Sequence, residues 1–152
     1  METIPSAQEA GVLTRLLAEE FPDTFAWLSF SCKDEEHICD GTTLKQCVDF
    51  CVKDCKQCVA VGVNCTSPQY IESLLHSISD CSKVILAYPN SGEGWDADRK
   101  TWLPETGFST NSFSALVEKW RAAGASMLGG CCRTTPKTIL EIRSCFQKAA
   151  PL

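Results

Sequence analysis

Cys58-Val59-Ala60-Val61-Gly62-Val63 is a run of apolar residues that leads directly into Asn64-Cys65-Thr66-Ser67-Pro68. A short apolar run that ends in turn-forming residues is typical of a strand buried on both faces of a sheet. Pro68 is suited to the first turn of a helix, because the amide hydrogen that proline lacks is not needed there. This stretch therefore predicts a strand, a short loop and a helix in immediate succession.

The same unit recurs along the chain. Further apolar runs predict strands at residues 25–30, 84–88 and 125–128. Apolar residues at helical spacing predict helices at about 6–20, 44–55, 68–78, 109–120 and 135–146, with Ser109 as the cap of the fourth. Strands that alternate with amphipathic helices indicate the α/β class, with a parallel sheet covered by helices. The segment 91–108 is too long for an ordinary connection and is expected to be a lid or a disordered insertion.

Three cysteines follow two of the predicted strands. Cys65 comes after the run 58–63, and Gly129-Gly130-Cys131-Cys132 comes after the run 125–128. The carboxyl ends of parallel strands meet at one edge of a sheet, where active sites are commonly built. Three thiolates suit a zinc ion whose fourth position stays open. Adjacent cysteines reach one ion only if the backbone turns sharply, and a Gly-Gly step permits such a turn.

Other interpretations of the cysteines stay open. Cys131 and Cys132 are also consistent with two small apolar side chains on opposite faces of a strand, or with a redox pair. Cys47, Cys51 and Cys55 repeat every four residues, which favours packing on the buried face of a helix. The spacing of Cys55 and Cys58 runs from a helix end into a strand, the reverse of the arrangement that activates a redox thiol.

The composition is that of a globular protein, with 44% hydrophobic and 22% charged residues. The net charge of −5 argues against nucleic acid or an anionic membrane as the main partner. The sequence shows neither an apolar run of membrane-spanning length nor the pattern of a signal peptide, so a cytoplasmic location is expected. Eleven cysteines, an odd number, argue against a complete disulfide framework, and reduced thiols fit that location.

Several motifs carry a resemblance to a known family. Val61-Gly62-Val63-Asn64-Cys65-Thr66, Tyr88-Pro89-Asn90-Ser91-Gly92-Glu93 and the stretch from Gly129 to Pro136 resemble signatures of the zinc-dependent homocysteine S-methyltransferases. Glu2-Thr3-Ile4-Pro5 and Ser29-Phe30-Ser31-Cys32-Lys33-Asp34 resemble two more. The sequence is most similar to the plant-type enzymes, which use S-methylmethionine or S-adenosylmethionine as methyl donor.

The resemblance implies a fold and a set of site residues. The family fold is a (β/α)8 barrel of roughly 250 residues, so residues 1–152 are expected to form its carboxyl-terminal half, about the last four strand–helix units. Cys65, Cys131 and Cys132 would be the zinc ligands. The residues expected to bind substrate are Glu2, Asn64 and Asn90. Glu2 would bind the amino group of homocysteine, or be an exposed terminal charge; the two asparagines would orient ligands, or form turns.

The implied activity is methyl transfer. The sulfur of homocysteine, bound to zinc as a fourth ligand, would attack the methyl group of the sulfonium donor and give methionine, so no catalytic side chain is expected. Selenocysteine is an alternative acceptor. Arg133 would bind a substrate carboxylate or form a surface ion pair.

A second function stays open, a non-catalytic zinc-binding half-barrel that associates with itself or with a full-length enzyme. A half-barrel leaves two unpaired strand edges, which predicts self-association or pairing with a complementary half.

Overall fold

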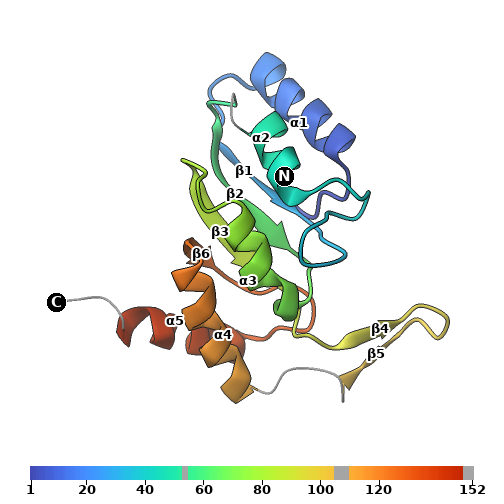
Figure 1. The fold of residues 1–152 in the computed structure, drawn as a ribbon, viewed down its shortest axis with the longest axis vertical. Coiled ribbons are helices and arrows are strands. Elements are labelled where there is room, and N and C mark those ends of the chain that lie inside the picture. The colour runs from blue at the N-terminus through green and yellow to red at the C-terminus, as the bar shows by residue number, and fades with distance from the viewer. Residues whose placement is uncertain (53–54, 105–109, 149–152) are drawn as a thin grey trace.

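In the computed structural model, which describes residues 1–52, 55–104 and 110–148, the chain forms a parallel sheet with helices packed against it (Figure 1). Within those ranges the main sheet has four strands in the order β1-β2-β3-β6. These strands are β1 (Ala26–Phe30), β2 (Cys58–Asn64), β3 (Val84–Tyr88) and β6 (Ala125–Leu128). The helices are α1 (Ala7–Glu20), α2 (Leu44–Cys51), α3 (Pro68–Ser77), α4 (Thr110–Ala122) and α5 (Pro136–Lys148). The α/β class predicted from the sequence is confirmed.

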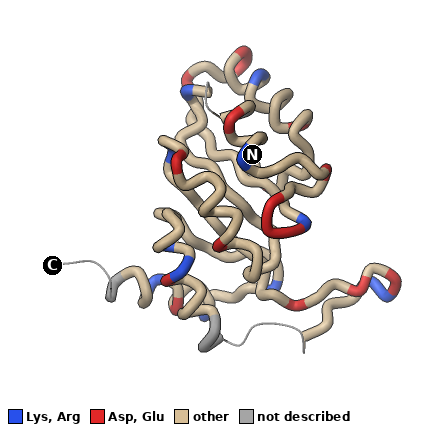
Figure 2. The backbone as a smooth tube through the Cα atoms, in the orientation of Figure 1, with Lys and Arg blue, Asp and Glu red and all other residues tan. Residues whose placement is uncertain are grey.

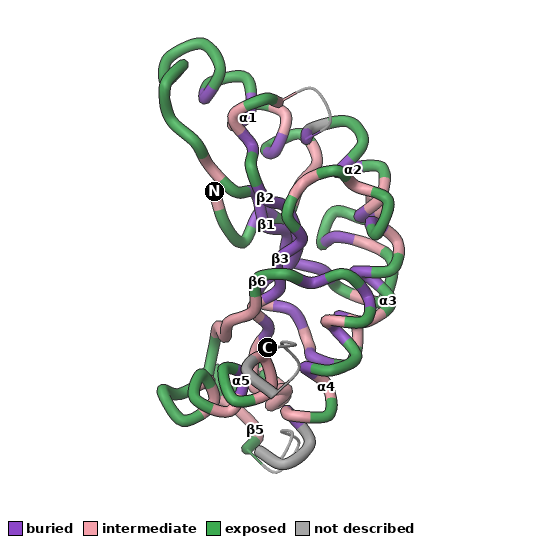
Figure 3. Tube along the Cα trace, turned by 90° about the vertical axis from the view of Figure 1, so that its left-hand side faces the viewer, coloured by how far each residue is buried: buried purple, intermediate pink, exposed green. Residues whose placement is uncertain are grey.

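All neighbouring strands of this sheet run parallel, because each connection between them contains a helix. Figure 3 shows α2, α3 and α4 along one side of the sheet, with the buried residues gathered in the strands and on the helix sides that face them. The core joins strand residues such as Leu28, Phe30 and Val61 to helix residues such as Leu74 and Trp120, all fully buried. Burying each of these side chains contributes about 1.5–3 kcal/mol to folding.

The first residues of the chain lie beside β1. The Met1 ammonium donates to the carbonyl of Trp27 at 3.0 Å, and the amide of Ser29 donates to the carbonyl of Met1 at 3.0 Å. Ile4 forms a parallel bridge with Phe30. Residues 1–4 thus pair with the outer edge of β1, as the end of a further strand would.

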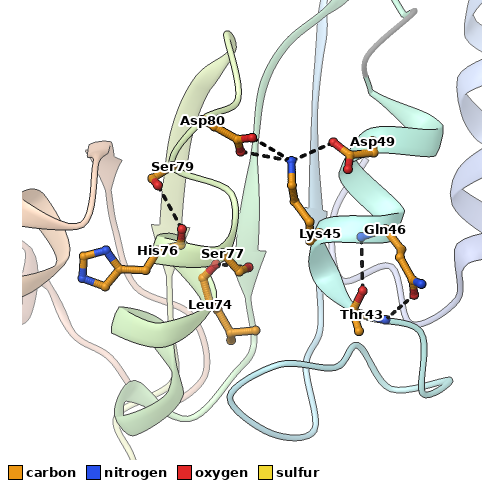
Figure 4. A network of polar contacts seen from close by, with 9 residues as sticks. All are labelled: Thr43, Lys45, Gln46, Asp49, Leu74, His76, Ser77, Ser79 and Asp80. Atoms are coloured by element: carbon orange, nitrogen blue, oxygen red, sulfur yellow. Dashed lines mark hydrogen bonds and ion pairs between the residues drawn. The ribbon is translucent and has the colours of Figure 1, made fainter.

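The second predicted helix is one turn shorter than expected. A capping box starts α2: the amide of Gln46 donates to Thr43 Oγ1 at 3.2 Å, and Gln46 Oε1 accepts from the Thr43 amide at 3.3 Å (Figure 4). The helix ends at Cys51, and the Cys55 amide donates to the carbonyl of Val52. Cys55 is therefore half-buried outside the helix, and the extension of the helix to residue 55 was wrong.

Of the three cysteines predicted to pack on the buried face of this helix, Cys47 is confirmed. Cys47 is buried in the core, whereas the side chain of Cys51 is not among those that the structure describes.

An ion-pair network joins α2 to the segment after α3. Figure 4 shows Lys45 between Asp49 and Asp80, with its Nζ 2.9 Å and 3.0 Å from their carboxylate oxygens. These groups are exposed, and such pairs contribute little to stability.

The long segment after β3 contains a hairpin at residues 94–103, so this part is not the disordered insertion that was one of the two expectations. Strands β4 (Gly94–Asp96) and β5 (Thr101–Leu103) pair antiparallel, and Figure 1 shows them extending away from the main sheet. The rings of Trp95 and Trp102 meet edge to face with centroids 5.1 Å apart. Asp96 Oδ1 accepts from the amides of Asp98 and Arg99 and closes the turn. The expected cap Ser109 lies outside the described residues.

The last helix differs from the prediction at one position. Ile142 is buried as expected, but Ile139 on the same helix is 45% exposed. Ile139 lines a hollow at the sheet together with Trp27 and Met127, which are also close to half exposed. No helix in the described part of the chain is both long and apolar enough to cross a membrane.

Candidate metal centre

The three cysteines that follow the strands lie together at one edge of the sheet. Cys65 follows β2, and Cys131 and Cys132 follow β6; their sulfur atoms all lie within 4.8 Å of one another. The Sγ atoms of Cys65 and Cys132 are 3.7 Å apart. Among the residues that the structure describes, this is the one group of three or more potential ligands close enough to share a metal ion.

The spacing of the sulfur atoms fits zinc. Zinc–sulfur bonds of about 2.3 Å in a tetrahedron place the sulfur atoms roughly 3.8 Å apart, close to the observed 3.7 Å between Cys65 and Cys132. The donor set is soft, and it leaves one tetrahedral position for another ligand. The arrangement could therefore hold a zinc ion without a large movement of the backbone.

Two residues at the cluster adopt left-handed backbone conformations. Cys65 has φ +48° and Arg133, directly after Cys132, has φ +65°. Such angles are uncommon for residues with a side chain and indicate local constraint at a site. Cys65 turns the chain directly after β2, and Arg133 turns it directly after the two cysteines that follow β6.

The two glycines before Cys131 serve a different purpose from the one expected. Neither has a positive φ; both are needed because of close packing. A Cβ at Gly129 would lie 3.3 Å from Tyr88 Cβ, and one at Gly130 would lie 2.3 Å from Thr134 Oγ1. The absence of side chains lets the turn that carries both cysteines pack against β3 and the start of α5.

Replacing Gly130 by alanine is therefore expected to weaken metal binding on the order of tenfold while leaving the fold intact. The added methyl group must push Thr134 aside, and Thr134 Oγ1 holds the turn through a 2.7 Å bond to the Cys131 carbonyl. Zinc affinity is measured by competition with a chromophoric chelator. Gly129→Ala is the matched control, because the tightest contact of its added Cβ would be 3.3 Å, and it should lose less zinc affinity than Gly130→Ala. Equal zinc affinity for Gly130→Ala and the parent chain would contradict the expectation.

Burial and crowding disfavour negative charge at the cluster. Burial raises the pKa of the Cys65 thiol to about 12, and the hydrogen bond with Cys131 and the nearness of Cys131 and Cys132 act in the same direction. Three thiolates so close together repel one another, so a cation is needed to hold them in the charged form.

Asn64 ties the beginning of the chain to this edge of the sheet. Its buried Oδ1 accepts from the Thr3 amide at 2.8 Å and from Ser29 Oγ at 2.9 Å, while Nδ2 donates to Thr3 Oγ1 at 2.7 Å. Nδ2 also lies 4.0 Å from Cys131 Sγ. The side chain is thus engaged within the protein, directly beside a cysteine of the cluster.

Glu2 belongs to a hydrogen-bonded group that the sequence analysis did not include. The Tyr88 hydroxyl donates to Glu2 Oε2 at 3.1 Å and accepts from Trp27 Nε1 at 3.1 Å. Burial raises the pKa of Tyr88, so the hydroxyl keeps its proton. Period-two alternation could have placed Trp27 on the face of its strand that carries Ser29, whereas the position of Tyr88 beside Asn64 depends on the register of β2 with β3.

Asn90 and Arg133, the remaining candidates, lie on the loops after β3 and β6. The Asn90 amide donates to the Thr66 carbonyl at 3.0 Å, but its side-chain Oδ1 is buried without a hydrogen-bond partner. Arg133 forms an ion pair with Glu93 at 2.7 Å. The structure therefore shows the ion-pair alternative for Arg133.

The fold and the site together define an α/β protein with a cluster of three thiols at the carboxyl edge of its parallel sheet. The family model described as "Homocysteine S-methyltransferase" matches residues 1–146. The chain belongs to the homocysteine S-methyltransferase family.

Individual relatives agree with this assignment. The chain is 48% identical to Homocysteine S-methyltransferase 2 of Arabidopsis thaliana over 93% of its own length and 42% of the relative. It is 46% identical to Selenocysteine Se-methyltransferase of Brassica oleracea var. italica, over 93% of the chain and 41% of the relative. The metallated form of the homocysteine methyltransferase MmuM from Escherichia coli superposes with a TM-score of 0.76 at 32% identity, covering 94% of this chain and 43% of that one. The chain thus spans less than half the length of these relatives.

Proposed function

We propose that this chain is the zinc- and homocysteine-binding half of a homocysteine S-methyltransferase, formed by about the last four strand–helix units of a (β/α)8 barrel. The observation that carries the proposal is the cluster of Cys65, Cys131 and Cys132. The family match over residues 1–146 and the superposition on less than half of a homocysteine methyltransferase support it.

Cys65, Cys131 and Cys132 would hold the zinc ion. Zinc bound there would lower the pKa of the acceptor thiol and would hold its sulfur in a fixed orientation. The cysteines of the cluster, Cys65, Cys131 and Cys132, are not in disulfides, which fits a reducing compartment, and we place the protein in the cytoplasm. Figure 2 shows Lys and Arg scattered among Asp and Glu along the described backbone, which supports neither nucleic acid nor an anionic membrane as partner.

The remaining site residues would bind the amino acid. The Glu2 carboxylate is suited to the ammonium group of homocysteine, and the Tyr88 hydroxyl orients that carboxylate through its 3.1 Å bond. Asn90 Oδ1, buried and unpartnered, is an acceptor available to a ligand. Asn64 would position the segment that carries Glu2, because it binds both polar groups of Thr3.

The reaction is the transfer of a methyl group between two sulfur atoms. The bond from the methyl carbon to the sulfonium sulfur of S-methylmethionine or S-adenosylmethionine breaks, and the new bond to the homocysteine sulfur gives methionine. The departing sulfur keeps the electron pair and leaves as a neutral thioether, so no side chain needs to protonate it. Selenocysteine is the second acceptor to test, because a relative is named for that activity.

The experiment uses the reduced chain loaded with Co²⁺, whose absorption reports the ligands around the ion. Homocysteine should change the spectrum in a saturable way, and Glu2→Gln should weaken this binding on the order of tenfold through loss of a charge-assisted hydrogen bond. Glu9→Gln, at an exposed position of α1, is the control. Methyl transfer from each labelled donor is then assayed with the same samples. A spectrum unaffected by homocysteine would refute the proposed acceptor site.

A second candidate is a non-catalytic half-barrel that binds zinc and associates with itself or with a full-length enzyme. The open face of the sheet favours it: Trp27, Met127 and Ile139 are each close to half exposed and line a hollow of about 410 Å³ with Leu86 and Tyr88. Such an apolar surface is suited to contact with another chain. Light scattering decides the association, because a stable monomer in dilute solution would contradict it.

A further inference from the structure

We propose that Glu93 and Arg133 are positioning residues for the thiol cluster, and that their ion pair holds the turn of Cys131 and Cys132 in place. This inference rests on the metal site of the proposed function. It assigns a role to two side chains that contact neither the cluster sulfur atoms nor a substrate in the structure.

The pairing of β3 with β6 continues beyond the ends of both strands. Backbone amides and carbonyls of the two loops bond in succession as far as the cysteines. The Gly129 amide donates to the Ala87 carbonyl at 3.0 Å, and the Cys131 amide donates to the Pro89 carbonyl at 2.8 Å. In the opposite direction, the Ser91 amide donates to the Cys132 carbonyl at 3.0 Å. The next contact along the same two segments is Arg133 Nε to Glu93 Oε2 at 2.7 Å. The ion pair therefore closes a series of bonds that enclose both cysteines.

The backbone at Arg133 needs such a restraint. Its φ of +65° lies in the left-handed region, which costs on the order of 1 kcal/mol or more for a residue with a side chain. Without a fixed side chain, the chain after Cys132 would relax toward ordinary angles. Since Arg133 follows Cys132 directly, that relaxation would move the cysteine away from its 3.7 Å approach to Cys65.

Burial distinguishes this ion pair from the others on the surface. The Glu93 side chain is only 15% exposed, and its backbone amide is held by Ser91 Oγ at 3.3 Å. In the pair of Lys119 and Glu72, by contrast, the side chains are 57% and 42% exposed and 3.4 Å apart. Exposed pairs contribute little, whereas removing Arg133 would leave the largely buried Glu93 carboxylate without its counter-charge. The contact of Glu93 with Arg133 is therefore the one whose loss should disturb its surroundings.

The test is an anaerobic titration of the reduced chain with Co²⁺, followed by the thiolate charge-transfer and d–d absorption. Glu93→Gln and Arg133→Gln should each weaken Co²⁺ binding on the order of tenfold and alter the d–d bands, as expected when a group that orients metal ligands is lost. Arg133→Lys keeps the positive charge and should restore most of the affinity. Glu72→Gln removes the exposed ion pair with Lys119 and should bind Co²⁺ like the parent chain.

Each outcome decides the inference. Parent-like affinity and spectra for both glutamine variants would overturn it while the proposed metal site stands. Failure of the parent chain to bind Co²⁺ would overturn the metal site and this inference together. If circular dichroism shows that Glu93→Gln does not fold, Arg133→Gln decides alone, since its side chain is 47% exposed and replaceable without burying a polar group.

Discussion

Cys132→Ser is expected to remove the zinc from a chain that otherwise holds about one ion. The sulfur of Cys132 lies 3.7 Å from that of Cys65 and is one of three sulfur atoms that lie within 4.8 Å of one another. A neutral hydroxyl is a poor ligand for zinc beside two thiolates, and two remaining ligands do not retain the ion through dialysis. Elemental analysis of the purified, fully reduced protein gives the number of zinc ions per chain.

The control is Cys39→Ser, because Cys39 is an exposed cysteine outside the cluster. It should keep its zinc. A full complement of zinc in Cys132→Ser would show that the ion is bound elsewhere. A folded parent chain without zinc would show that this half of the family fold does not assemble a metal site.

Gly62→Ala is expected to destabilise the fold by at least about 3 kcal/mol. A Cβ at Gly62 would lie 1.7 Å from the carbonyl oxygen of Leu86 and 2.7 Å from its carbonyl carbon. Both contacts are with backbone, so no side chain can rotate to relieve them. β2 and β3 pair at this position, and the strands would have to separate in the centre of the sheet. Urea denaturation followed by circular dichroism measures the change in the free energy of unfolding.

Gly11→Ala is the matched control, since the same methyl group is added in the middle of α1. Its Cβ would meet only Phe50 Cε1, at an ordinary 3.5 Å. Because alanine favours a helix over glycine, this variant should be more stable by about 0.5–1 kcal/mol. Equal stability of the two variants would mean that the sheet adapts at Gly62.

Much of the fold was predictable because its strands are apolar almost throughout. Continuous apolar runs located β3 and β6 to the residue, and the ends of β1 and β2 to within one residue. The hairpin of β4 and β5 escaped prediction, because three-residue strands are too short to show a pattern and its tryptophans pack on each other. Helical spacing alone also placed Ile139 in the core, although its side chain is close to half exposed and lines a hollow at the sheet.

The candidate site was predictable as far as topology determines it. Parallel strands bring their carboxyl ends together, so the positions of Cys65 and of Cys131 and Cys132 in the chain already imply that they are near one another. Side-chain partners are not determined by topology. The bonds of Asn64 to Thr3, and the bond between Tyr88 and Glu2, depend on how residues 1–4 dock.

The cysteines of the cluster belong to strands that do not touch. Cys65 follows β2 and Cys131 follows β6, and β3 lies between these two strands. An ion bound there would span the middle strand and join segments that are otherwise far apart in the chain, as a cross-link does. Because the unfolded chain has no such site, every tenfold rise in free zinc above the dissociation constant would add about 1.4 kcal/mol to stability. The melting temperature of this protein would then rise with the concentration of free zinc around it.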